Sequence, residues 1–169
     1  MIDSVGKIAG TFLAVVLLFF APMLILAQKQ EMIMESYVFA KTAYLVEHIR
    51  SDGYLSKQMY EQYERQLALT GFLYDIEMEH KKPVYYKEDE SGNYKKQYQK
   101  EYEEIILEGV LGEEETYRMK RGDLFFIKVT SRTKSLADRM KSYFFIPTDT
   151  APAIQVELGG LIRDETAGL

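Results

Sequence analysis

The chain has no cysteine, so disulfide bonds and metal sites built on thiolates are excluded. It has no tryptophan, one asparagine and only two histidines, His48 and His80. Acidic residues outnumber basic residues by 26 to 21, and the net charge of −5 lies entirely after residue 50. A surface that binds nucleic acid needs an excess of basic residues to neutralise phosphates. The composition therefore argues against nucleic acid as a partner, and also against an anionic lipid surface.

The sequence patterns of common active sites are also missing. The chain has no glycine-rich phosphate loop and no Gly-x-Ser-x-Gly motif. The two histidines lack the spacing of a metal site, and we interpret them as ordinary surface or boundary residues. We interpret the glutamate-rich stretch as the solvated face of a helix and a loop; it contains Glu101, Glu103, Glu104, Glu108, Glu113, Glu114 and Glu115. The sequence thus predicts no enzyme, no cofactor and no metal.

The most distinctive stretch of the chain is Ile8–Ala27, twenty consecutive residues without a charge or an amide side chain. As a helix it would be about 30 Å long, which is the thickness of the hydrocarbon core of a bilayer. We predict a transmembrane helix that is retained as an anchor. A removed signal peptide is the alternative, because Ile25, Leu26 and Ala27 form an acceptable cleavage site.

The helical pattern continues beyond the apolar run. One set of apolar residues recurs at spacings of four, three and four: Ile33, Tyr37, Ala40 and Tyr44. A second set extends the same broad face: Val38, Leu45 and Ile49. Gly53 is suited to a left-handed C-terminal cap. We therefore predict one continuous helix from about Ser4 to Arg50, with its first half in lipid and its second half against a soluble domain.

Several residues inside the apolar run bear on helix packing. Gly10 and Ala14 form a small-xxx-small pair, and Ala21 lies seven residues after Ala14. Small residues let two helix backbones approach closely. Pro22 frees a backbone carbonyl and is expected to bend the helix.

The chain divides into four predicted segments. They are a cytoplasmic tail at 1–7, a transmembrane helix at 8–27, its amphipathic extension at 28–50, and an extracytoplasmic domain at 51–169. The lysines and arginines around the span are nearly balanced, so the orientation rests on the short N-terminus. We expect a single-pass protein of the cell membrane with its N-terminus inside and its domain outside.

We predict an α+β domain, with a small antiparallel sheet and short helices packed on the long helix. The expected elements are a helix from Leu55–Ser56 to about Thr70, a strand at 72–80, a short edge strand at 84–86 after Pro83, a loop at 87–96, a helix at 98–109, a β-hairpin (116–131) around Arg121-Gly122-Asp123, a short helix at 136–144, and a strand at 153–163. In the last strand, Gly159 and Gly160 suggest a bulge or a close backbone approach.

This architecture resembles type IV pilin-like proteins, and TadE-like anchored proteins of bacteria most closely. The shared features are Ile8–Ala27 with Pro22 inside it, the extension to Arg50, and the sheet-rich C-terminal half. The position five residues after Gly6 departs from the prepilin pattern, since it holds Thr11 where prepilins have glutamate.

The resemblance implies a subunit or minor pilin of a surface filament or secretion apparatus that self-assembles through its helix. Its expected partners are the lipid bilayer and copies of itself or other pilin-like subunits. The expected assembly residues are Gly10, Ala14, Ala21, Pro22, Ile33, Tyr37, Ala40 and Tyr44. The alternative is a bitopic assembly component of a conjugation or secretion channel, with a domain that binds a partner outside the membrane.

Overall fold

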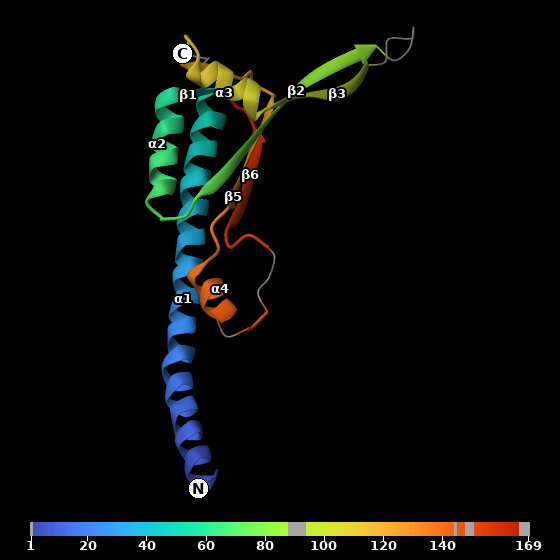
Figure 1. The fold of residues 1–169 in the computed structure, drawn as a ribbon. Coiled ribbons are helices and arrows are strands. Elements are labelled where there is room, and N and C mark those ends of the chain that lie inside the picture. The colour runs from blue at the N-terminus through green and yellow to red at the C-terminus, as the bar shows by residue number, and fades with distance from the viewer. Residues whose placement is uncertain (1, 88–93, 144, 148–150, 166–169) are drawn as a thin grey trace.

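The computed structural model describes residues 2–87, 94–143, 145–147 and 151–165. The elements follow one another as α1 (Ile2–Asp52), β1 (Tyr54–Ser56), α2 (Lys57–Ala68), β2 (Tyr74–Lys87), β3 (Tyr94–Tyr102), α3 (Glu103–Leu111), β4 (Thr116–Arg118), β5 (Leu124–Ser131), α4 (Leu136–Tyr143) and β6 (Gln155–Leu161). This is an α+β fold in which one long helix packs on an antiparallel sheet, as the sequence predicted (Figure 1).

Helix α1 is continuous over 51 residues, which corresponds to about 75 Å. It ends at Gly53, whose backbone N–H donates to the Ile49 carbonyl at 2.9 Å and whose φ of +74° is the predicted left-handed cap. The most apolar part of the helix has a mean hydropathy of 2.5, and none of it is buried by the protein. By length and composition this helix is able to cross a membrane, as an anchor or as a signal sequence.

The domain is built around the C-terminal half of α1. Figure 1 shows α2 on one side of this half and the sheet on the other. Val38, Leu45 and Ile49 of α1 are buried in the same core as Phe125 and Ile127 of β5. The helix thus provides one wall of the core, and the inner face of the sheet provides the other.

The main sheet has the strand order β3-β2-β5-β6, and every neighbouring pair is antiparallel. Along β5 buried residues alternate with half-buried ones, which is the pattern of a strand with one face in the core. Strands β1 and β4 form a separate two-stranded sheet.

The glycine pair of β6 allows a close backbone approach and does not form a bulge. The register runs unbroken through Phe126–Gly159 and Phe125–Gly160. A Cβ on Gly159 would lie 2.3 Å from the Phe125 carbonyl oxygen, and one on Gly160 would lie 2.9 Å from Nε of Arg50. Arg50 itself donates from Nε to the carbonyl oxygen of Leu161 at 3.1 Å. Glycine therefore lets β6 lie tightly between β5 and the end of α1.

Three predicted elements differ from the structure. Residues 98–102 belong to β3 and not to a helix, which covers only Glu103–Leu111. Pro83 does not interrupt β2, because β5 pairs with β2 only as far as Lys81 and leaves one edge of the strand open at the proline. The predicted hairpin at 116–131 is wrong, since β4 pairs with β1 while β5 pairs with β2 and β6.

Smaller differences concern the remaining predicted elements. Ser56 caps α2 by accepting a hydrogen bond from the Met59 N–H at 3.3 Å, but Leu55 lies in β1 and not in the helix. Helix α4 agrees with the predicted short helix, whose last residue, 144, lies outside the described residues. The centre of the predicted 87–96 loop, 88–93, also lies outside them, and strands β2 and β3 lead into it on either side.

Candidate functional site

The extension of α1 carries two apolar faces, and the domain covers only one of them. Val38, Leu45 and Ile49 are buried, whereas Ile33 and Tyr44 are 65% and 62% exposed. The single broad face that the sequence suggested is therefore wrong. At about 100° per residue, the two groups are centred about 130° apart around the helix.

The uncovered face is mostly apolar. It is formed by Met32, Ile33, Ser36, Phe39, Ala40 and Tyr44, and we call it the exposed helix surface. These residues span about 140° of the helix at 3.6 residues per turn. A contiguous exposed apolar surface on a folded protein marks a contact with another protein or with a membrane.

A hollow of about 170 Å³ between α1 and α2 adjoins this surface. Tyr44 and His48 line it from α1, and Met59 and Tyr63 line it from α2. The rings of Tyr44 and His48 have centroids 4.4 Å apart, which fixes Tyr44 against the rim. The hollow gives the exposed helix surface a recess next to its largest side chain.

The predicted assembly residues fall into two stripes on α1. Gly10, Ala14 and Ala21 lie within about 40° of one another and are all exposed. A second stripe lies about 100° away around the helix and comprises Pro22, Ile33, Ala40 and Tyr44. Tyr37 lies at the edge of the second stripe, about 20° from Tyr44. Unlike Ile33, Ala40 and Tyr44 it is half-buried, with the Lys41 ammonium 5.4 Å from its ring centroid. The sequence pattern did not identify Met32 and Phe39 as part of the exposed helix surface, because their exposure depends on how the domain is docked.

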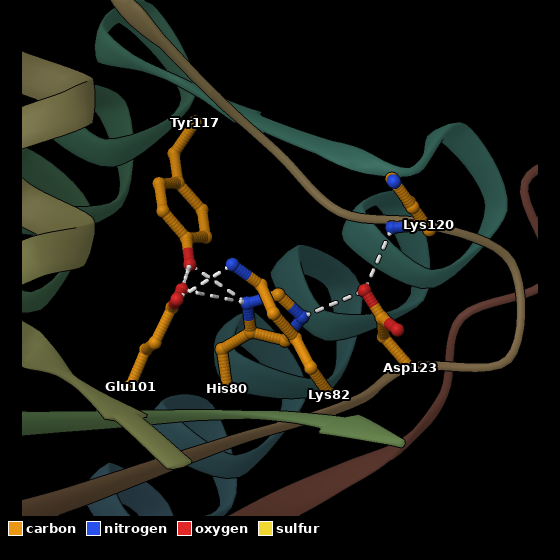
Figure 2. A network of polar contacts seen from close by, with 6 residues as sticks. All are labelled: His80, Lys82, Glu101, Tyr117, Lys120 and Asp123. Carbon is orange, nitrogen blue, oxygen red and sulfur yellow. Dashed lines mark hydrogen bonds and ion pairs between the residues drawn. The ribbon is translucent and has the colours of Figure 1, made fainter. Parts of the chain in front are cut away.

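A buried polar network lies at the base of the β2–β3 hairpin, as Figure 2 shows. The imidazole of His80, which is 0% exposed, contacts the Tyr117 hydroxyl through Nδ1 at 2.7 Å and the Asp123 carboxylate through Nε2 at 2.9 Å. Tyr117 donates to Glu101, which also accepts from the Lys82 ammonium at 2.6 Å. The expectation of a surface or boundary histidine holds for His48, which is exposed, and is wrong for His80.

The electrostatics of this network favour a charged carboxylate beside a neutral phenol. Burial works to raise the pKa of Glu101, but hydrogen bonds from Lys82 and Tyr117 lower it below the ordinary value. Burial raises the pKa of Tyr117, and the hydrogen bond to Glu101 raises it further. An Asp–His–Tyr arrangement can relay protons, but this imidazole is sealed from solvent. The network instead joins β2, β3, β4 and the turn before β5.

The Arg121-Gly122-Asp123 tripeptide forms the turn that closes this network. Gly122 has a φ of +95°, and Asp123 N–H donates to the Lys120 carbonyl at 3.0 Å. The Asp123 carboxylate is buried and accepts from the Lys120 N–H at 2.8 Å. The aspartate therefore points into the protein and is not exposed to a partner outside it.

The glutamate-rich stretch is distributed over several environments. Glu103 and Glu104 line a hollow of about 540 Å³ together with Glu77, Glu157 and Lys128. Burial raises the pKa of Glu103, and the nearby charges of Glu77 and Asp75 add to the shift. The glutamates at 108, 113, 114 and 115 are exposed, as expected for a solvated face. Within the described part of the chain, no group of three or more histidine, aspartate or glutamate residues is placed to hold a metal ion.

Comparison with protein-family models, with curated proteins and with solved structures found no match. The likeness to pilin-like proteins therefore remains one of architecture: a long apolar N-terminal helix packed on an antiparallel sheet. Among the features described above, the exposed helix surface is the best candidate for a functional site.

Proposed function

We propose that the protein is a membrane-anchored, pilin-like subunit that assembles with copies of itself through α1. In this proposal Ile8–Ala27 is retained as a transmembrane helix, with the N-terminus inside and the domain outside. The protein acts as a structural component of a surface filament or secretion apparatus, and its function depends on the contact between subunits.

The observation that carries the proposal is the exposed helix surface. It belongs to the part of α1 beyond the apolar run, where water would otherwise surround Ile33 and Tyr44. Burying one large apolar side chain contributes about 1.5–3 kcal/mol, so a contact that covers Met32, Ile33, Phe39 and Tyr44 would contribute several kcal/mol. A second copy is a suitable occupant, because a helix in the same membrane presents the same surface at the same height.

The span supports the same mode of assembly. Gly10, Ala14 and Ala21 form an exposed stripe of small residues, and a Cβ on Gly10 would meet nothing within 4 Å. In lipid, helices associate through close packing at such residues, since there is no hydrophobic driving force between them.

Replacing Ala14 by leucine tests this proposal in the span. The change keeps the helix apolar, so insertion should be normal, but the larger side chain should hold a neighbouring helix away. We expect fewer multimers after chemical crosslinking of native membranes, with an unchanged amount of protein in the membrane. The matched control is Ala9→Leu, which makes the same change at an exposed residue about 140° away around the helix.

The outcome also separates the proposal from its alternative. If Ala14→Leu forms multimers as well as the parent and the Ala9→Leu control, the small residues of the span do not carry the contact, and self-assembly would rest on the exposed helix surface alone. If the parent itself forms no multimers, the bitopic channel component is the better description, with a partner bound by the domain.

A further inference from the structure

The short helix α4 lies where the apolar run of α1 ends. It contacts α1, and Figure 1 shows it as the element of the domain nearest to the N-terminal half of that helix. Ala27, the last residue of the run, is buried, whereas Leu26 and Gln28 on either side of it are exposed. The hydrocarbon core of a membrane spanned by Ile8–Ala27 ends within about one turn of Ala27. Helix α4 therefore stands at the level of the lipid headgroups.

The orientation of α4 is fixed by contacts at its N-terminal end. The Ser135 hydroxyl is buried and accepts a hydrogen bond from the Asp138 N–H at 3.0 Å, which caps the helix. Ala137 is buried as well. These contacts leave Leu136, Arg139 and Tyr143 exposed.

The exposed side of α4 and of the turn after it is aromatic and basic. Tyr143 is 77% exposed and Phe145 is 96% exposed. Lys134 and Arg139, in the same short segment of the chain, are exposed as well. Three basic residues stand against one acidic residue, Asp138, over 134–146, although the chain as a whole has a net charge of −5. Exposed aromatic rings beside lysine and arginine are typical of the interface between a membrane and water.

We propose that α4 and the turn after it dock on the headgroup layer of the membrane, as a second membrane contact beside the span. Tyr143 and Phe145 lie among the headgroups and the upper acyl chains, and Lys134 and Arg139 face anionic phosphates. The bilayer is the expected occupant because the patch adjoins the end of the span. The contact needs the span in the membrane but not a second copy, and it would hold the domain at a fixed tilt.

The absence of tryptophan permits a direct test on the full-length protein. Phe145→Trp introduces the only indole at the proposed contact. Leu111→Trp introduces one at the exposed end of α3, which lies at the far end of the domain (Figure 1). Each variant is reconstituted at low density in vesicles of phosphatidylcholine and phosphatidylglycerol, with and without bromine on the upper acyl chain. We expect blue-shifted emission that brominated lipid quenches at position 145, and neither effect at position 111.

A charge reversal completes the test. In the Phe145→Trp protein, Arg139→Glu should lower the equilibrium constant for docking on the anionic membrane by at least about fivefold. Loss of one basic residue near an anionic surface already changes that constant by this factor. Arg118→Glu, an exposed change on β4, should leave the quenching unchanged. Emission at position 145 that matches position 111 and is unquenched would overturn the proposal. Blue-shifted emission that brominated lipid does not quench would also overturn it, since protein would then cover the patch. Neither result depends on the formation of multimers, so this test is independent of the test of self-assembly.

Discussion

Replacing Gly159 by alanine should lower the free energy of unfolding of the domain by about 3 kcal/mol, because the added methyl group overpacks the contact with β5. A Cβ there would lie 2.3 Å from the carbonyl oxygen of Phe125 and 2.8 Å from Cα of Phe126. Both atoms belong to the backbone of β5, so neither can move without separating β6 from the sheet. Urea denaturation in detergent, followed by near-ultraviolet circular dichroism, measures the loss.

Gly71 offers a control that changes the backbone without adding a collision. Its φ is +76°, and a Cβ there would meet nothing within 4 Å. Asparagine tolerates this left-handed conformation, so Gly71→Asn should cost less than about 1 kcal/mol. Equal losses for Gly71→Asn and Gly159→Ala would contradict the close approach of β6 to β5.

Removing the imidazole of His80 should also destabilise the domain by about 3 kcal/mol. His80→Ala leaves the Asp123 carboxylate buried without its side-chain partner and the Tyr117 hydroxyl without the ring nitrogen. It also leaves a cavity in a fully buried site. The same urea titration measures the effect. Tyr117→Phe should cost about 2 kcal/mol, because it leaves Nδ1 of the buried imidazole and the Glu101 carboxylate without the hydroxyl.

A double-mutant cycle separates the network from simple packing. In the double variant that combines His80→Ala with Asp123→Ala, neither residue is left without its partner. The loss of unfolding free energy should therefore be clearly smaller than the sum of the losses in the two single variants. Additive losses would show that the hydrogen bond between His80 and Asp123 does not couple these residues energetically.

The parts of the fold that follow from local chemistry were predictable from the sequence. The apolar run and the repeat that follows it predict helix α1, and Gly53 predicts where the helix ends. Ser56 marks the start of α2 in the same way, because the capping bond joins residues three apart. The alternation of Tyr74, Ile76 and Met78 with acidic residues likewise predicts a strand at the start of β2, and Met78 is buried in the core.

The parts that depend on distant partners were not predictable in this way. Tyr98 and Tyr102 have a helical spacing, yet nine pairs with β2 hold residues 94–102 in a strand. Strand β4 precedes a turn signal that suggests a hairpin with β5, but its partner β1 lies about sixty residues earlier in the chain. Tertiary pairing overrides local preference in both cases.

The candidate site shows the same division. The sequence identifies Ile33, Ala40 and Tyr44 as apolar residues of one helix, but periodicity cannot tell which apolar face a domain will cover. That choice depends on the docking of β5, β6 and α2 around Val38 and Ile49. The burial of His80 depends equally on Asp123, which a turn brings to it across 43 positions of sequence.

The central claim, that the exposed helix surface joins copies of the chain, is tested most directly by photocrosslinking in native membranes. A benzophenone analogue of phenylalanine can replace Tyr44 on this surface or Tyr85 on β2, two tyrosines of nearly equal exposure, 62% and 61%. The account predicts that the probe at position 44 forms adducts of twice the chain mass that mass spectrometry identifies as the chain joined to itself, and that the probe at position 85 does not. Adducts at position 85 to a different protein, with none at position 44, would contradict self-assembly through α1 and support a channel component.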